Sequence, residues 1–430
     1  MEEKSWTGKR FMRTSNKTQF AGFGIFIFLN LFSLSLLSTS IYVGPDQLIK
    51  SIKIGIQSAK TGDTIIVKGG WYKEGNMIIN KTITLLGKDL PVLDGENKYE
   101  IITLSGKNIS ISGFKFLNSG ASAMNDFASI KCIDASDILI SNNIIINAYF
   151  AIHVSNTSHA HIKDNIIEGQ SKNEQNTGNG IHLWKCNNAL IEGNQVSGHR
   201  DGIYFEFVTE SRIQYNYSTK NIRYGLHFMF SHNDEYNHNT FIDNGAGVAV
   251  MYSHNVHMEN NTFENNWGAS AYGILLKDIS DSRIHNNYFI QNTVGIFMEG
   301  SSRMFIEKNT FRNNGWGMKV QASCNDNEFK YNNFMGNTFD VATNGTMMLN
   351  LFSCNYWDKF EGYDLNKDSF GDVPYHPVSM YAMIVEQNPV CLILLRSILI
   401  SILDKAEKAI PSITPINLVD EKPKMSPNQL

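Results

Sequence analysis

The sequence predicts an all-β fold, a right-handed parallel β-helix with coils of about 22 residues, an N-terminal capping helix and a C-terminal helical tail. Two repeated marks predict this fold. A Gly-apolar-x-apolar motif recurs at Gly180, Gly202, Gly225, Gly247, Gly273, Gly295 and Gly317. An asparagine that precedes short apolar pairs recurs at Asn143, Asn165, Asn194, Asn216, Asn239, Asn261, Asn287, Asn309 and Asn333. Both series keep nearly the same spacing and lengthen at the same coil, so they report one repeating unit of short strands.

The composition agrees with such a repeat. The chain has 430 residues, of which 18% are charged, and a net charge of -4, whereas average domains contain about 25% charged residues. Asparagine fills the gap with 48 residues. This much Gly and Asn excludes a coiled coil, a collagen and a multi-span membrane protein, and the even distribution of apolar residues excludes disorder. Nothing in the charge balance indicates a nucleic-acid partner.

Residues 1–40 have the pattern of a secretory signal peptide. A basic segment precedes an apolar run over 20–37, and the small residues Ser38, Thr39 and Ser40 follow it. This order predicts cleavage near Ser40, although the apolar run is also long enough to remain as a membrane anchor. In both cases the rest of the chain is exported.

Five cysteines are spread over the exported part, at Cys132, Cys186, Cys324, Cys354 and Cys391. Their odd number and wide spacing argue against a disulfide framework and against a thiolate metal cluster. We expect most of them to be small buried apolar residues. A Cys324–Cys354 disulfide is the alternative.

The β-helix is predicted to span residues 41–345, with a capping helix over Asp46–Ala59 and a polar loop over 170–177. Stacked coils place equivalent residues about 4.8 Å apart, so the repeated asparagines should form a hydrogen-bonded ladder. Asparagine also tolerates the left-handed backbone of a sharp corner. The Phe residues two places later should stack inside as an aromatic column, namely Phe241, Phe263, Phe289 and Phe311.

One outward face of two adjacent coils carries a candidate metal site. Its members are His227, Met229, His232, Met251 and His254. Thioether and imidazole groups suit Cu(I), whereas Mg²⁺ and Ca²⁺ prefer oxygen ligands. The alternative is that these side chains fill a surface hidden under a loop or partner. Arg200, Asp201 and Arg223 precede glycine corners, where they either bind an anion or form salt bridges.

A catalytic constellation is not recognisable in the sequence. A polysaccharide-cleaving β-helix needs a pair of nearby carboxylates, but Glu206 and Glu299 lie four coils apart. Asp201 with Glu206 is the remaining couple, and nothing else in the sequence supports it. We therefore expect a protein that is not an enzyme.

Residues 346–378 form a predicted C-terminal turn or cap segment. The alternating Asp364, Asn366 and Asp368 resemble the start of a calcium loop, yet Ser369 and Tyr375 occupy positions where such a loop has Gly and Glu. A structural turn and a calcium site both remain open.

Residues 379–430 are predicted to be a helical tail, with a helix from Pro389 to Ala409. Its apolar stretch is too short to span a bilayer. Apolar residues cover more of its circumference than a cap over the last coil requires, so docking on a membrane protein is the second interpretation. The predicted docking residues are Leu392, Leu395, Arg396, Leu399 and Ile402.

Several segments resemble the NosD family of periplasmic maturation proteins of nitrous oxide reductase. They are Arg-Asp-Gly-Ile-Tyr at 200–204, Arg-Tyr-Gly-Leu-His-Phe-Met-Phe-Ser-His at 223–232, Met-Tyr-Ser at 251–253, Gly-Ile-Leu-Leu-Lys-Asp-Ile at 273–279 and Asn-Tyr-Trp-Asp at 355–358. Relatives often have Tyr where this chain has Phe228 and Phe230. The opening Gly62-Asp63 and Gly70-x-Tyr72 resemble the wider group of carbohydrate-binding and sugar-hydrolase β-helix domains, so a carbohydrate-binding or polysaccharide-cleaving protein is the alternative.

The NosD resemblance implies a periplasmic accessory protein with several partners. These are an ABC transporter made of a permease and an ATPase, a copper chaperone lipoprotein, and nitrous oxide reductase, whose copper–sulfide centre the protein helps to assemble. The resemblance also implies that His227, Met229 and Met251 bind copper and that the tail helix docks on the permease.

Overall fold

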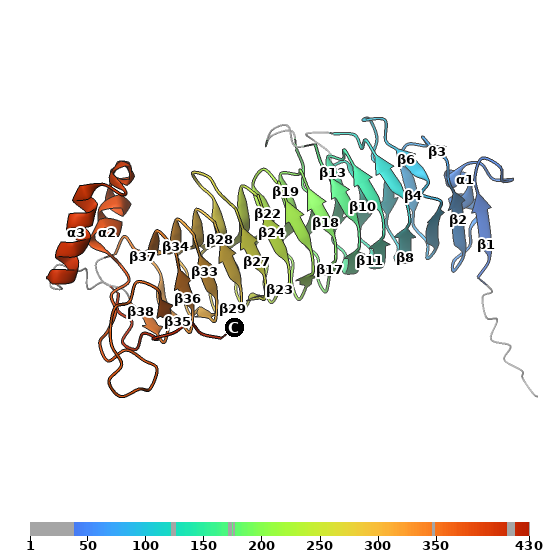
Figure 1. Cartoon of the computed structure of the whole chain (residues 1–430). Coiled ribbons are helices and arrows are strands. Elements are labelled where there is room, and N and C mark those ends of the chain that lie inside the picture. Colours follow the sequence, from blue (N-terminus) through green and yellow to red (C-terminus); the bar gives the residue numbers. More distant parts are fainter. Residues whose placement is uncertain are drawn as a thin grey trace, which may run out of the picture. The chain divides into compact units, whose positions relative to one another are not determined.

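The computed structural model describes residues 38–121, 126–170, 174, 177–345, 349–410 and 418–429. Nearly all of the predicted signal peptide and much of the predicted loop at 170–177 therefore lie outside the described residues. Residues 38–430 form one compact unit. In it, three all-parallel sheets, here sheets A, B and C, run the length of a stack of coils (Figure 1). The predicted parallel β-helix is confirmed.

Each complete coil contributes one strand to each sheet, and the coils at the two ends of the stack are incomplete. Sheet A has 14 strands: β1 (Ser40–Val43), β2 (Thr64–Lys68), β5 (Thr84–Lys88), β8 (Lys107–Ser112), β11 (Ser136–Ser141), β14 (Ser158–Lys163), β17 (Leu190–Glu192), β20 (Arg212–Gln214), β23 (Glu235–Asn237), β26 (His257–Glu259), β29 (Arg283–His285), β32 (Phe305–Glu307), β35 (Asn325–Lys330) and β38 (Leu349–Ser353). Sheet B has 13 strands: β3 (Trp71–Tyr72), β6 (Val92–Asp94), β9 (Lys115–Leu117), β12 (Ile144–Ile146), β15 (Ile166–Glu168), β18 (Gln195–Ser197), β21 (Tyr217–Thr219), β24 (Thr240–Ile242), β27 (Thr262–Glu264), β30 (Tyr288–Ile290), β33 (Thr310–Arg312), β36 (Asn333–Met335) and β39 (Tyr356–Trp357). Sheet C has 12 strands: β4 (Met77–Ile79), β7 (Ile102–Leu104), β10 (Ala128–Ile133), β13 (Phe150–Ser155), β16 (Ile181–Trp184), β19 (Asp201–Glu206), β22 (Tyr224–Met229), β25 (Ala246–Met251), β28 (Tyr272–Lys277), β31 (Val294–Glu299), β34 (Trp316–Val320) and β37 (Phe339–Ala342).

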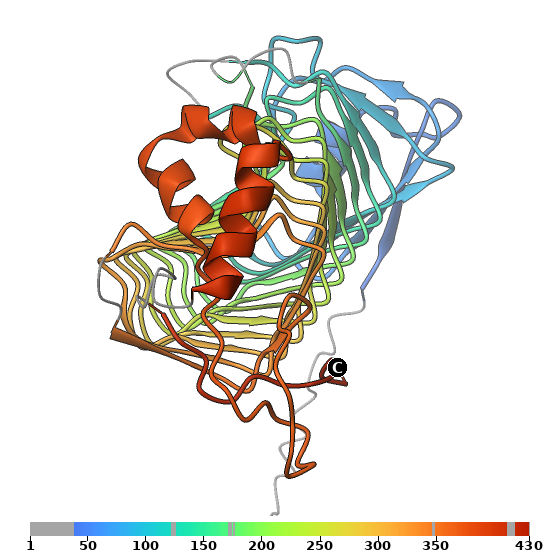
Figure 2. The same cartoon turned by 60° about the vertical axis from the view of Figure 1, so that its left-hand side comes forward.

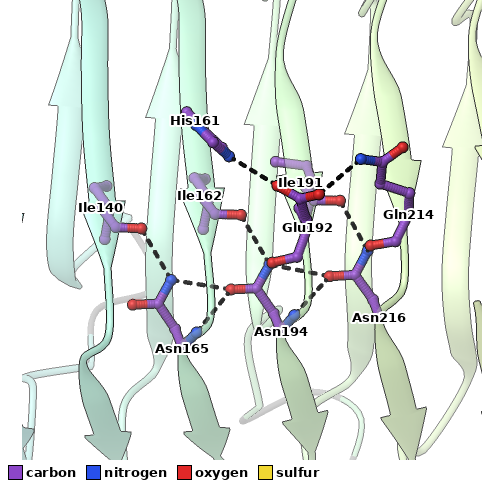
Figure 3. A network of polar contacts seen from close by, with 9 residues as sticks. All are labelled: Ile140, His161, Ile162, Asn165, Ile191, Glu192, Asn194, Gln214 and Asn216. Carbon is purple, nitrogen blue, oxygen red and sulfur yellow. Dashed lines mark hydrogen bonds and ion pairs between the residues drawn. The ribbon is translucent and has the colours of Figure 1, made fainter.

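The asparagine ladder forms at the corner between sheets A and B (Figure 3). The side chain of Asn194 donates to Asn216 Oδ1 at 3.0 Å and to the carbonyl of Ile162 at 2.9 Å. Asn216 repeats the pattern with Asn239. Each fully buried amide therefore has partners in the coils before and after it, which removes the cost of burying it.

Two details of the predicted ladder were wrong. The left-handed residue is the one before the ladder asparagine, for example Asp164 at φ 53° and Tyr215 at φ 56°. At the C-terminal end the ladder continues from Asn309 through Asn332, not Asn333, and then to Asn355. Asn333 instead lies in sheet B, opposite Thr310.

A second asparagine ladder, which the sequence analysis missed, runs along the corner between sheets B and C. Its members are Asn221, Asn244, Asn266, Asn292, Asn314 and Asn337. The predicted aromatic column is also present between these corners. Phe263, Phe289 and Phe311 stack with ring centroids 4.8 Å apart. Sheet C faces this column and has room only for glycine there, because a Cβ atom on Gly225 would lie 2.8 Å from Phe241 Cδ1.

A short helix, α1 (Ile52–Ser58), packs over the first coil, within the range predicted for the cap. Ser51 caps its N-terminus by accepting from the Ile54 amide, and Glu74 accepts from the amides of Ile52 and Lys53. Acceptors at this end satisfy amides that have no partner within the helix.

Helical structure in the tail begins before the predicted helix start at Pro389, and the helix is broken. It consists of α2 (Met380–Gln387), the 3₁₀ helix η2 (Pro389–Leu394) and α3 (Ile398–Ala409), with Arg396 left-handed at φ 68° between them. These helices do not add a further coil to the stack, although Met383 of α2 packs against the interior core. Tyr381 and Ile400 join Trp316 in an apolar cluster on the outer face of sheet C, separate from the interior core. Figure 2 shows the red helices in front of the coils. No helix among the described residues is long and apolar enough to cross a membrane.

The end of the stack is closed by residues 418–429 instead. Asp420 pairs with Phe352, and Lys424 pairs with Tyr356, as isolated parallel bridges. The carboxylate of Asp420 accepts from the Asn355 side chain at 3.0 Å and from Trp357 Nε1 at 3.1 Å. Asp420 thus takes the place of the next ladder asparagine.

In the turn around Asp364, side-chain oxygens accept hydrogen bonds from backbone amides of the same turn. Asp364 accepts from the amides of Asp368 and Ser369, and Asn366 accepts from the Asp368 amide. These bonds favour the structural turn over a calcium site.

All five cysteines are free, so the Cys324–Cys354 disulfide does not form.

Candidate metal-binding face

The candidate site lies on the outer face of sheet C, in the coils of β19, β22 and β25. Side chains alternate along a strand, so Leu226 and Phe228 enter the interior core while His227 and Met229 point away from it. Met229 lies directly opposite Met251 in the next coil. Parallel strands hold such neighbours about 4.8 Å apart. We call His227, Met229 and Met251 the metal face.

The metal face is ordered by aromatic rings. The ring of His227 lies 4.9 Å from that of Tyr204 and 4.8 Å from that of Tyr224, centre to centre. Tyr204 Oη lies 3.8 Å from Met229 Sδ. His227 is only 4% exposed, whereas the two methionines are half-buried. The histidine is thus held in place, and the thioethers remain within reach of solvent.

His232 and His254 lie apart from the metal face. Their rings stack at 4.0 Å with an angle of 23°, but left-handed corners at Phe230 and Tyr252 turn the chain between them and the methionines. Within the described part of the chain, no group of three His, Cys, Asp or Glu residues is placed to hold a metal ion. His227, Met229 and Met251 thus share the outer face of sheet C, and His232 and His254 follow beyond its corner.

Asp201 is the charged neighbour of His227. Its Oδ2 lies 3.6 Å from His227 Nδ1 and 3.7 Å from Arg200 Nε. Asp201 is fully buried, and neither of its oxygens nor either ring nitrogen of His227 has a hydrogen-bond partner among the described residues. Arg223 pairs with Glu174 at 3.3 Å. The two arginines thus form ion pairs, in agreement with the salt-bridge interpretation of this corner.

The rings of Tyr204 and His227 belong to a column of outward-facing rings, here called the ring column. Toward the N-terminus this column includes histidines that the sequence pattern did not indicate as ligands. His153 lies opposite His182, and their ring centroids are 4.8 Å apart. His182 packs on Tyr204 at 4.7 Å. Burial lowers the pKa of His153 to about 4 and lowers the pKa of His182 well below its ordinary value. The sequence pattern did not reveal His153, because this residue precedes the first Gly-apolar-x-apolar motif. Its position relative to the repeat was therefore not known.

The predicted docking residues lie on the exposed side of the tail. Leu399 and Ile402, on α3, are about 60% exposed, and Leu392, Leu395 and Arg396 are also exposed. More exposed apolar residues accompany them, namely Val390, Ile393 and Ile398, each above 80% exposure. The inner side chain Ile400 is buried against sheet C. The tail therefore presents several exposed apolar side chains, here called the tail patch: Val390, Leu392, Ile393, Leu395, Ile398, Leu399 and Ile402.

Residues 164–370 match the protein family described as "Periplasmic copper-binding protein (NosD)". This region is just under half of the chain, and it includes the metal face. A protein of Pseudomonas aeruginosa named "Probable ABC transporter binding protein NosD" is 35% identical over 130 residues, which are 30% of this chain and 30% of that protein. The predicted resemblance to NosD is confirmed over these regions.

Solved structures with the same fold act on polysaccharides. A family 28 exopolygalacturonase of Yersinia enterocolitica is 10% identical and has a TM-score of 0.56, over 74% of this chain and 78% of that chain. The catalytic domain of a GH87 α-1,3-glucanase in complex with tetrasaccharides is 11% identical and has a TM-score of 0.60, over 74% of this chain and 69% of that chain. At this identity the likeness shows the parallel β-helix fold alone.

Proposed function

We propose that this chain is an exported periplasmic accessory protein that handles Cu(I), docks on an ABC transporter and assists assembly of the copper–sulfide centre of nitrous oxide reductase. The observation that carries the proposal is the metal face, where one imidazole and two thioethers share neighbouring positions. The description of the matching family and the name of the Pseudomonas relative support it.

The residues of the metal face fit Cu(I) as cargo. Thioether sulfur and imidazole nitrogen are suitable ligands for this soft ion. The ring nitrogens of His227 have no other partner among the described residues, so one of them is available for the ion. Asp201 lies on the Nδ1 side of the ring, where a carboxylate orients a ligating imidazole. A half-buried site that holds its ion weakly suits a protein that must also release that ion.

The tail patch supports docking on the membrane-embedded permease. Large apolar patches on a protein surface usually mark interaction sites. Here the patch lies on helices that are anchored to sheet C by Tyr381 and Ile400, so it is presented on a fixed base. In this proposal the permease covers the patch, the ATPase acts from the other side of the membrane, and a copper chaperone lipoprotein supplies the ion.

A role in polysaccharide cleavage is the weaker candidate. Asp201 belongs to the only carboxylate couple that the sequence offered, and it has no solvent exposure. A polymer has no access to that carboxylate in this conformation. We therefore propose an accessory role for the chain, and an assay for cleavage of polyuronides is the direct test of the alternative.

The metal face is tested by Cu(I) affinity, measured by competition with a chromogenic chelator under anaerobic conditions. Met229→Ala combined with Met251→Ala should weaken binding at least tenfold, because the site loses both sulfur ligands. Met335→Ala is the matched control, since Met335 is a half-buried methionine on sheet B. Unchanged affinity in the double variant would refute copper binding at the metal face.

A further inference from the structure

Three large apolar side chains are exposed together at the N-terminal end of the stack. Leu48, in the loop after β1, is fully exposed, while Ile54 of α1 and Trp71 of β3 are 55% and 59% exposed. All three line one shallow cavity of about 570 Å³. Figure 1 shows α1 and β1 at the blue end of the stack, opposite the tail helices. We call Leu48, Ile54 and Trp71 the cap patch.

The closure of the first coil does not need the cap patch. The inner face of α1 covers the core with Ile52 and Ile56, which are both buried, whereas Ile54 lies on the outer face. Trp71 is held in place, because its Nε1 donates to Asp94 Oδ2 at 3.2 Å. Exposed apolar side chains that gather in this way usually mark an interaction site.

The charge of this end suits an anionic surface. Residues 40–74 contain five lysines and three acidic residues, a net charge of +2, whereas the whole chain has -4. Lys50 and Lys53 are exposed, and Lys50 lines the same cavity as the cap patch. The carboxylates of Asp63 and Glu74 accept from backbone amides, and Lys53 Nζ donates to the carbonyl of Glu74. These carboxylates are therefore engaged by the backbone rather than by the lysines.

The chain connects this end directly to the apolar run over 20–37. In both interpretations of residues 1–40 that run enters the membrane during export. Thr39 already belongs to the fold, since its carbonyl accepts from the Thr64 amide at 3.0 Å. Two residues span at most about 7 Å, and β1 is the outermost strand of sheet A. The end that carries the cap patch therefore emerges at the membrane surface.

We propose that the cap patch binds the surface of a bilayer that contains anionic phospholipids. Leu48, Ile54 and Trp71 enter the interface, and the neighbouring lysines contact the phosphate groups. Tryptophan and lysine are typical of such interfaces, and lysines near an anionic leaflet add to binding. Three side chains are far fewer than the roughly 20–30 residues that one partner contributes to a stable protein interface, so a lipid surface fits the patch better than a protein. The inference does not depend on the proposed function.

The test measures co-sedimentation with lipid vesicles. It uses the chain from Ser38 onward, which forms one compact unit and lacks the apolar run. We expect binding to vesicles of phosphatidylglycerol and phosphatidylethanolamine, little binding to phosphatidylcholine vesicles, and a decrease as salt is added. Leu48→Glu combined with Ile54→Glu should lower the partition coefficient at least tenfold, because burial of a charge is costly. The fold should persist, since Glu three residues after the helix cap Ser51 favours α1.

Tyr217→Glu combined with Phe305→Glu is the matched control. It makes the same charge change at two half-exposed side chains on sheets B and A, away from the cap patch, and should bind vesicles as the unmodified chain does. The cap variant should still co-purify with the permease in detergent, which separates lipid binding from docking through the tail patch. Absence of binding to the anionic vesicles, or equal binding to phosphatidylcholine, would overturn the proposal. Equal partition of the cap variant and the unmodified chain would overturn it as well.

Discussion

At the scale of single residues, side chains that differ from the repeated pattern have unusual environments. Asp234 occupies a corner position where a later coil has Asn327, and both side chains accept from the backbone amide of the preceding coil, at 2.8 and 2.9 Å. Asn327 also donates to the Ser301 carbonyl, whereas Asp234 Oδ2 has no partner among the described residues. A carboxylate in an amide position is therefore poorly solvated.

The pH dependence of stability should report this carboxylate. Burial raises the pKa of Asp234 to about 8, with Glu210 adding to the effect. Because the unfolded value is about 3.9, the folded chain holds an extra proton between these values, and the free energy of unfolding falls as pH rises toward 8. From pH 6.5 to 8 this loss is about 2 kcal/mol. Asp234→Asn should abolish it in denaturant unfolding.

The window above pH 6.5 isolates Asp234 from the buried histidines. The pKa values of His153 and His199 are lowered to about 4 by burial, so these groups make stability fall as pH drops from 6.5 toward 4. The control is Asp281→Asn, because hydrogen bonds from Arg303 lower the pKa of Asp281 to about 2. Parallel pH curves for the unmodified protein and Asp234→Asn would contradict the assignment.

At the scale of elements, the strands were predictable and the tail was not. Strand positions follow from spacing, because every coil must place an apolar residue inside at the same register. In the tail, local pattern indicated one helix from Pro389 to Ala409. The structure breaks it at Arg396 and adds α2 before it. Tyr381 of α2 and Ile400 of α3 pack in the same apolar cluster, and such tertiary contacts leave no periodic mark in the sequence.

The candidate site was predictable for a related reason. Met229 and Met251 share a register position, so counting from the glycine mark placed them together. The same count placed His232 beside His254, and their rings stack, but left-handed corners at Phe230 and Tyr252 lie between these histidines and the methionines. Asp201 was not recognised as part of the face, since its contact with His227 depends on side-chain directions that the period does not encode.

The tail patch gives the prediction at this scale. Ile398→Glu combined with Leu399→Glu should abolish co-purification with the transporter permease, because the charges oppose burial of the patch. The melting temperature should stay nearly unchanged, since the two side chains are 81% and 60% exposed. Ile54→Glu, on exposed α1 at the other end of the stack, is the control. A complex that survives the double substitution would contradict docking through the patch.

At the scale of the whole molecule, the stack behaves as a chain of similar units, each stabilised by its two neighbours. The interior units gain ladder bonds on both sides, while the last unit depends on residues 418–429. Burial raises the pKa of Asp420, and the bonds from Asn355 and Trp357 oppose this effect. A deletion of the complete tail would also remove Asp420 and so open the last coil. Point substitutions are therefore needed to test docking without disturbing folding.

Asp420→Ala should destabilise one end of the molecule only. The side-chain amide of Asn355 and Trp357 Nε1 would lose their acceptor, at about 1–3 kcal/mol for each unpaired buried donor. Hydrogen exchange should accelerate in β38 and β39 and stay slow in β19 to β25. Asp420→Asn keeps an acceptor oxygen and should change exchange much less. Uniform acceleration along the stack would show that the coils unfold as one unit.

The repetition of the coil has a consequence for the distance between functions. The metal face lies in β22 and β25, and the tail patch is anchored at β31 to β37. Between Met251 and Trp316 the chain advances three coils, or about 14 Å at 4.8 Å per coil. Because the ladders join any coil to the next, gain or loss of one coil would change the separation between the metal face and the tail patch by one fixed step. Evolution could thus adjust the reach of the protein in whole units while both ends remain unchanged.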